Sequence, residues 1–183
     1  MRFDEFDFDD NKSVYNPSTG NATPDRIDLT DDPIILGESY TQEVWIYRIP
    51  GGGNWIDKII GTGYGQNSPP GIYIKKLGGV KIGYGYGNGG AAKFYEVEVE
   101  NTLNQWTHIA VTKDTTNLIL YINGEEVDHI TWCCPGQIPV ESPQIRLGHN
   151  YLGKMDNVRM WNVARTQEQI QPVSYTHLRA HET

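Results

Sequence analysis

The segment from Trp106 to Val127 constrains the fold of this chain more than any other stretch. It reads WTHIAVTKDTTNLILYINGEEV, with two runs of β-branched and aromatic residues on either side of a polar loop at 113–117. Because side chains alternate across a strand, each run is typical of a strand with two different faces in a sandwich or a half-covered sheet. Asn123-Gly124 adds a second reversal, since a type I′ turn needs positive φ at both central residues. The segment therefore predicts three adjacent antiparallel strands.

The composition of the whole chain agrees with an all-β fold. Its 183 residues include 20 Gly and 10 Pro, and helical periodicity is sparse, which favours short strands joined by turns. This length is sufficient for one domain with a sizeable core. The formal net charge of −8 argues against nucleic-acid binding, which needs a basic face for phosphates. Apolar runs are too short for a membrane span, so no insertion into a membrane is predicted.

Further strands are predicted along the rest of the chain, without an internal repeat or a clear linker. They cover residues 1–8, 26–29, 40–49, 55–60, 71–77, 80–86, 93–99, 144–147 and 154–161. The segment 10–25 is predicted to be a loop, and 130–142 is predicted to be irregular. Thr166 and Gln169 have the spacing of a capping box, which predicts one short C-terminal helix with Ile170 as its first apolar anchor.

The last residues differ from the rest of the chain. Residues 172–183, PVSYTHLRAHET, resemble the conceptual translation of a sequencing adapter, which implies an open reading frame taken from assembled reads. We therefore expect one native domain over residues 1–171, followed by a non-native tail without a functional site. A genuine polar tail is the alternative, and it too would carry no site.

Several motifs point to one family. The specific ones are the segment 106–127 and LGKMDNVRMWNVARTQEQI at 152–170, and weaker ones are MRFDEF at 1–6, RIDLTDDPIILGESY at 26–40 and YTQEVWIYR at 40–48. Together they resemble the laminin-G-like, concanavalin-A-like jelly-roll superfamily, and within it the bacterial laminin-G-like lectin group. The resemblance implies an antiparallel two-sheet jelly-roll sandwich, placed outside the cell or at its surface. Gln42 stands where the family usually has an aliphatic residue.

The resemblance also implies a function. Such domains are often non-catalytic recognition modules of larger secreted or surface proteins, and they bind carbohydrates or glycoproteins. We therefore expect a polysaccharide or glycan as the partner. The alternative is a structural or adhesion domain that docks to neighbouring domains without binding sugar, because a fold alone does not fix a function.

A sugar site is expected to combine an exposed aromatic ring with nearby polar groups, because a sugar has an apolar C–H face and a rim of hydroxyls. The aromatic residues in or near loops with Gly, Asn or Asp neighbours are Trp55, Tyr64, Trp132 and Tyr151. They are the candidate ligand-binding residues. The alternative for each is that it covers an edge of the core, since Trp and Tyr are usually mostly buried. Trp45, Trp106 and Trp161 fall inside matched strands and are assigned to the sandwich.

Calcium is the metal ion that the sequence favours. Hard cations bind carboxylate and carbonyl oxygens, often from separate loops. Asp156 stands where many family members have an Asp near the opening strand, and Asp9 and Asp10 belong to that opening region. The three could hold a structural Ca²⁺ that joins the first and last strands. The alternative is a solvated acidic edge.

Catalysis is not predicted, although two sets of carboxylates alternate along predicted strands. A retaining glycosidase needs two carboxyl groups about 5–5.5 Å apart. The two sets are Glu96, Glu98 and Glu100 in YEVEVE, and Glu5, Asp7 and Asp9 near the start of the chain. Neither set lies in a Trp-rich segment. A solvated strand face, with Val97 and Val99 directed inward, explains the first set.

Overall fold

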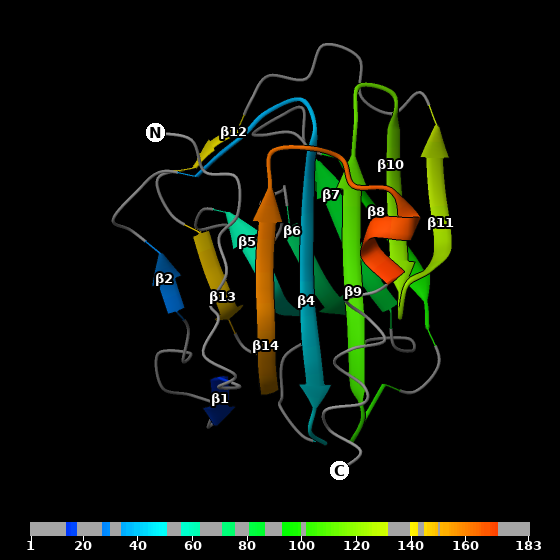
Figure 1. The fold of residues 1–183 in the computed structure, drawn as a ribbon. Coiled ribbons are helices and arrows are strands. Elements are labelled where there is room, and N and C mark those ends of the chain that lie inside the picture. The colour runs from blue at the N-terminus through cyan, green and yellow to red at the C-terminus, as the bar shows by residue number, and fades with distance from the viewer. Residues whose placement is uncertain are drawn as a thin grey trace.

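The computed structural model of this chain is a sandwich of two antiparallel β-sheets (Figure 1). It describes residues 14–17, 27–29, 34–50, 56–62, 71–75, 81–86, 93–99, 102–131, 140–142, 145–149 and 151–171. Its two layers and its single short helix confirm the predicted all-β class. No helix among these residues is long and apolar enough to cross a membrane.

Each sheet has six strands. In sheet A the spatial order is β1 (Val14–Pro17), β14 (Leu152–Trp161), β4 (Tyr40–Arg48), β9 (Trp106–Lys113), β10 (Asn117–Ile122) and β11 (Glu125–Thr131). In sheet B it is β2 (Ile27–Leu29), β13 (Ile145–His149), β5 (Ile56–Thr62), β6 (Gly71–Lys75), β7 (Lys81–Tyr86) and β8 (Lys93–Glu98). A third, two-stranded sheet pairs β12 (Val140–Ser142) with β3 (Ile34–Leu36).

The three strands predicted from the segment 106–127 are confirmed. β9 pairs with β10 and β10 pairs with β11, all antiparallel. Asn123 and Gly124 both have positive φ, at 51° and 82°, as the predicted turn requires. Because the turn fixes where the chain reverses, it also fixes the end of β10 and the start of β11, which matter for the site described below.

Two predicted irregular segments contain strands. Residues 10–25 include β1, and residues 130–142 include β12 and the end of β11. Both predictions are wrong for those residues, because each short strand is defined by a distant partner: β1 pairs with β14, and β12 pairs with β3. The local amino-acid composition does not predict such long-range pairing. The predicted strand at 1–8 lies outside the described residues.

The main core lies between the two sheets. Alternate residues of the central strands face it, and fully buried examples are Val44 and Ile46 of β4, Ile72 and Ile74 of β6, and Ile109 of β9. In β8, Glu96 and Glu98 are exposed, whereas Val97 and Val99 pack against this core, as the alternation predicted.

The outer face of sheet A is covered by the end of the chain. Residues 167–171 form the short helix, which lies in front of sheet A in Figure 1. The backbone N–H of Thr166 donates to Gln169 Oε1 at 3.0 Å, so the predicted capping box is present. Ile170 is fully buried against Ala110 and Tyr121, which confirms it as the apolar anchor.

Candidate functional site

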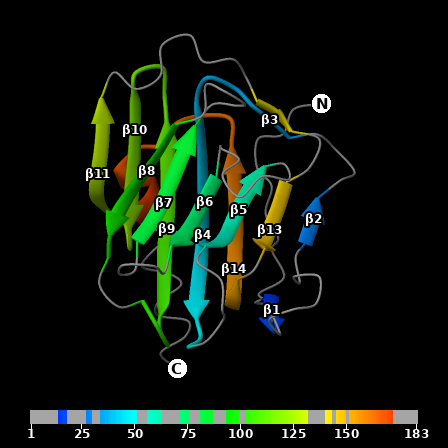
Figure 2. The same ribbon diagram turned by 180° about the vertical axis from the view of Figure 1, so that it is seen from behind.

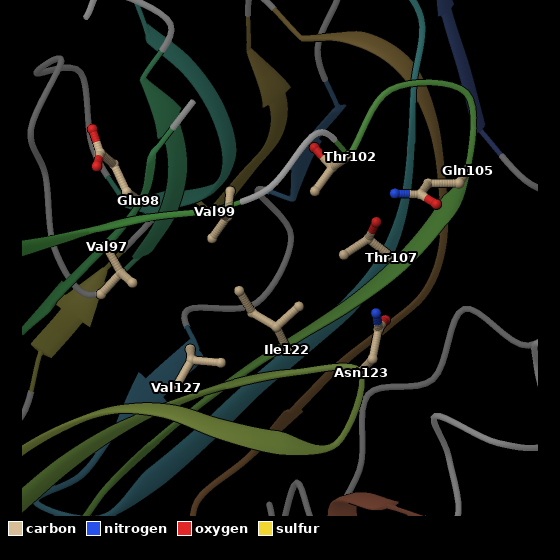
Figure 3. Close-up of a pocket in the computed structure, with 9 residues that line it drawn as sticks. All are labelled: Val97, Glu98, Val99, Thr102, Gln105, Thr107, Ile122, Asn123 and Val127. Atoms are coloured by element: carbon tan, nitrogen blue, oxygen red, sulfur yellow. The ribbon is translucent and has the colours of Figure 1, made fainter. Parts of the chain in front are cut away.

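A cavity of about 340 Å³ opens at one lateral edge of the sandwich. We call it the edge cavity. Its lining residues are Val97, Glu98, Val99, Thr102, Gln105, Thr107, Ile122, Asn123 and Val127 (Figure 3). The volume is near the lower end of the usual range for ligand pockets, about 300–1,000 Å³, so it suits a small ligand or one group of a larger ligand.

The edge cavity exists because the two sheets end without joining. β8 is the edge strand of sheet B and β11 is the edge strand of sheet A, and both lie along the same side of the molecule (Figure 2). Beside the cavity, the Tyr84 hydroxyl donates to Asp128 Oδ2 at 2.7 Å and so ties β7 to β11. This contact holds the two edges at a fixed separation.

The walls of the edge cavity are aliphatic. Val99 and Ile122 point toward one another across the opening, and Val97 lies beside them (Figure 3). Val127 is 41% exposed, one of the two exposed large hydrophobic side chains of the described residues. Apolar walls with a few placed polar groups are the usual composition of a ligand site.

Two buried threonines supply polar groups. Arg48 Nη1 donates to Thr102 Oγ1 at 2.7 Å, so the Thr102 hydroxyl hydrogen remains able to donate elsewhere. Arg48 is itself buried, and burial lowers the pKa of its guanidinium, against the opposing effect of Asp57 and Tyr151. Thr107 is 2% exposed, and it also lines the cavity.

The turn at the base of the edge cavity is held by β9. Asn123 Oδ1 accepts a hydrogen bond from the His108 backbone N–H at 2.9 Å. The Asn123 backbone N–H donates in turn to the His108 carbonyl oxygen at 2.9 Å. This pair of bonds fixes Asn123 and the adjacent Ile122 relative to the start of β9. The cavity therefore has a rigid floor.

Tyr151 is the one predicted aromatic residue within the described part of the chain, and it does not line this cavity. Tyr151 is fully buried in the core, its hydroxyl donates to the Lys154 carbonyl oxygen at 3.2 Å, and burial raises the pKa of that hydroxyl. Its ring is therefore not an exposed plate for a sugar, and the prediction for this residue is corrected. Trp55, Tyr64 and Trp132 lie outside the described residues and stay predictions.

Asp156 is the only predicted metal ligand within the described residues. It is 7% exposed, and its Oδ1 accepts from the Asn157 backbone N–H at 2.8 Å. Val14 pairs with Met155, so the start of β1 lies one register position from Asp156. Asp9 and Asp10 lie outside the description, and no group of three metal-ligating side chains occurs among the residues that it covers. Calcium therefore remains a prediction.

The alternating carboxylates of β8 are engaged differently. Glu96 pairs with Lys75 at 3.0 Å and accepts a hydrogen bond from the Tyr73 hydroxyl at 3.2 Å. Glu98 lines the edge cavity, and Glu96 does not. The two therefore do not face one another across this cavity. Glu5, Asp7, Asp9 and Glu100 lie outside the described residues.

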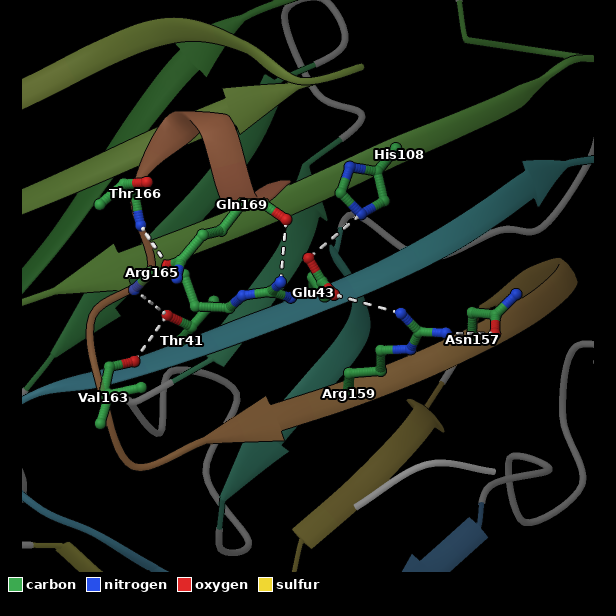
Figure 4. A network of polar contacts seen from close by, with 9 residues as sticks. All are labelled: Thr41, Glu43, His108, Asn157, Arg159, Val163, Arg165, Thr166 and Gln169. Atoms are coloured by element: carbon green, nitrogen blue, oxygen red, sulfur yellow. Dashed lines mark hydrogen bonds and ion pairs between the residues drawn. The ribbon is translucent and has the colours of Figure 1, made fainter. Parts of the chain in front are cut away.

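A second polar cluster lies on the outer face of sheet A, around a carboxylate that is closed to solvent (Figure 4). The Glu43 carboxylate is fully buried, with His108 Nε2 at 3.6 Å, Arg165 Nη1 at 3.4 Å and Arg159 Nη1 at 4.0 Å. His108 packs at 5.1 Å from the Trp45 ring, between ring centroids. Both are fully buried, on the outer face of sheet A and not between the sheets. Trp161, also on this face, is partly buried.

Sequence reasoning missed most of the edge cavity. The alternation along YEVEVE had directed Val97 and Val99 inward, and that was the available signal. It could not show that two edge strands from different sheets lie together, because this depends on strand order. Thr102 lies between strands, where no periodicity applies.

Comparison with known proteins agrees with this architecture. The laminin-G-type family model described as the concanavalin A-like lectin/glucanases superfamily matches residues 21–171. The comparison with curated proteins gave no match.

Solved structures share the fold at low sequence identity. The binding domain of botulinum neurotoxin DC in complex with rat synaptotagmin II has a TM-score of 0.67 and 18% identity, over 90% of this chain and 45% of that one. The serotype D ligand-binding domain in complex with N-acetylneuraminic acid has a TM-score of 0.61 and 14% identity, over 94% and 45%. A native heptameric SAP-like pentraxin from Limulus polyphemus has a TM-score of 0.68 and 15% identity, over 88% and 81%. The chain thus spans less than half of the toxin domains.

Proposed function

This chain belongs to the concanavalin A-like lectin/glucanase superfamily, and from that premise we propose that it is a non-catalytic recognition module that binds carbohydrate. The observation that carries the proposal is the edge cavity, with aliphatic walls beside the hydroxyls of Thr102 and Thr107. A sugar can present its C–H groups to the aliphatic walls and its hydroxyls to the two threonines. One structural relative is solved in complex with N-acetylneuraminic acid, which is a sugar, and this supports carbohydrate as the class of ligand.

The proposal is for binding and not for hydrolysis. Glu98 alone of the β8 carboxylates lines the cavity, whereas a retaining reaction uses two converging carboxyl groups. We place the module in a larger secreted or surface protein, as is common in the family. A structural Ca²⁺ at Asp156, with Asp9 and Asp10, belongs to the same proposal.

A docking function is the second candidate, and Val127 favours it. This exposed hydrophobic side chain lies on edge strand β11, where a neighbouring domain could cover it. In that case the edge cavity would be filled by a protein side chain, and the isolated chain would bind no glycan.

Glycan-array binding of the full chain tests the proposal, with and without a chelator. The key variant is Val127→Arg, which places a long charged side chain at the edge cavity. Val163→Arg is the matched control, because Val163 is 53% exposed and lies outside the cavity. We expect the wild type and V163R to bind the same glycans and V127R to lose them.

The other outcomes separate the candidates. Binding that survives in V127R but is lost on replacing Trp55, Tyr64 or Trp132 with Ala would move the sugar site to those aromatic residues. A wild type that binds no glycan at millimolar concentration would favour the docking function.

A further inference from the structure

The edge cavity has walls of an unusual kind for a sugar site. Nine described residues line it; none of them is aromatic, and four are Val or Ile. A pyranose ring face is best matched by a flat aromatic plate, whereas branched aliphatic side chains surround small, rounded groups such as a methyl. Resting on the proposed carbohydrate-binding function, we infer that the edge cavity selects sugars that carry an acetamido group.

The apolar part of an acetamido group fits the aliphatic walls. Val99 and Ile122 face one another across the opening, with Val97 and Val127 together on one side of them and the threonines on the other (Figure 3). Burying one methyl group in such a pocket raises affinity about fourfold. A sugar with a hydroxyl at the same position would lose this gain and would place an oxygen against the valines.

The polar part fits the two threonines. The acetamido carbonyl oxygen accepts hydrogen bonds. Thr102 Oγ1 already accepts a hydrogen bond from Arg48, so its own hydroxyl hydrogen can be donated to that oxygen. Thr107 lines the cavity beside Thr102, so a ligand acceptor that enters the cavity can also meet the Thr107 hydroxyl, which is able to donate. A ligand that supplies an acceptor at this place is therefore favoured.

The charge of the lining determines which acetamido sugars fit. Among the described residues that line the cavity, Glu98 is the single ionisable side chain, and none is Lys or Arg. A sugar carboxylate would meet Glu98 without a compensating cation, whereas the N–H of a neutral acetamido group can donate to it. The cavity therefore favours neutral acetamido sugars over N-acetylneuraminic acid, the acidic acetamido sugar bound by one structural relative.

Titration calorimetry on the full chain tests this inference. The probes are an oligosaccharide of N-acetylglucosamine, the matching oligosaccharide of glucose, N-acetylneuraminic acid and an acetyl-lysine peptide. We expect the N-acetylglucosamine probe to bind at least about fivefold more tightly than the glucose probe, from the methyl and hydrogen-bond contributions together. The acidic sugar and the peptide should bind more weakly than the N-acetylglucosamine probe.

Two variants locate the preference. Thr107→Val removes the hydroxyl with little change of shape. It should weaken binding of the N-acetylglucosamine probe about 2- to 10-fold and binding of the glucose probe by less, so that the ratio of the two affinities falls. Glu98→Gln alters an exposed side chain, so it is expected to fold, and it should strengthen binding of N-acetylneuraminic acid. Thermal melting checks that both variants are folded.

The outcomes are distinguishable. If sugars bind the wild type without a preference for the acetamido group, or if neither variant changes that preference, the inference is overturned and the proposed function stands. If no sugar binds wild type, the proposed function itself fails. If the acetyl-lysine peptide binds and the sugars do not, the acetamide chemistry is right but the carbohydrate assignment is overturned.

Discussion

Arg165 Nη1 lies 3.4 Å from Glu43 Oε1, and this contact ties the end of the described chain to a carboxylate buried on sheet A (Figure 4). Arg165 also stacks on the Trp161 ring at 4.3 Å from its centroid. Its backbone N–H donates to Thr41 Oγ1 at 2.9 Å. The C-terminal helix is therefore held on sheet A by charge as well as by Ile170.

Replacing Arg165 with Met should destabilise the fold by about 2 to 4 kcal/mol, because Glu43 would lose its nearer guanidinium partner while buried. The double variant E43Q/R165M should be less destabilised than R165M alone, since it removes the uncompensated charge as well. Denaturant unfolding measures both. Equal destabilisation of the single and double variants would show that Glu43 does not depend on Arg165.

Replacing Gln42 with Leu should stabilise the fold by about 1 to 2 kcal/mol. Gln42 is fully buried on the core face of β4, and neither its Oε1 nor its Nε2 has a hydrogen-bond partner. Gln105→Leu is the matched control, because Gln105 is exposed and should change stability by less than about 0.5 kcal/mol. A clear loss of stability in Q42L would mean that the buried amide is satisfied.

Asp114 should make stability depend on pH. Partial burial acts to raise the pKa of its carboxyl, but hydrogen bonds from Asn117 and Thr116 outweigh this and hold the pKa below its ordinary value of 3.8. A lowered folded pKa contributes stability that is present above the unfolded pKa and is lost as pH falls through the folded pKa.

Asp114→Asn should therefore be less stable than wild type near pH 7, and the gap should close as pH falls below 3.8. Thr115→Ala, at the exposed neighbouring position, is the control and should show no such gap. Unfolding curves between pH 7 and pH 2 measure it. A gap that stays constant across that range would rule out this role for the Asp114 carboxylate.

If calcium binds as proposed, millimolar Ca²⁺ should raise the Tm of the wild type, because a ligand that binds the folded state stabilises it by mass action. Asp156→Asn should reduce that shift by removing one charged ligand. Differential scanning calorimetry with Ca²⁺ and with chelator measures the difference. A wild-type Tm that is the same with Ca²⁺ and with chelator would contradict the proposed calcium site.

The fold could be predicted because its signals are local. The alternation in β9 and β10, and the positive φ that Asn123 and Gly124 can adopt, depend on residues close in sequence. The pairing partners of strands were harder to predict, because β1 and β12 pair with strands far along the chain. Predictions from local pattern therefore gave the layers, but they missed the three short strands β1, β3 and β12.

The site could be predicted only in part, for a related reason. Tyr151 stands beside Asn150 and near Gly153 in the sequence, which indicated an exposed loop, yet its ring turns into the core and its hydroxyl reaches Lys154. The edge cavity needs β8 of one sheet to lie near β11 of the other. Alternation assigned Val97 an inward direction, but it could not name Ile122 or Val127 as its neighbours.

The most direct measurement is a map of backbone amide chemical shifts in the full chain during titration with an oligosaccharide of N-acetylglucosamine. The account predicts that saturable shifts gather on Val99, Thr107, Ile122, Asn123 and Val127, and that V127R abolishes them. Saturable shifts that leave these five amides unchanged and gather elsewhere would contradict the assignment of the edge cavity as the sugar site.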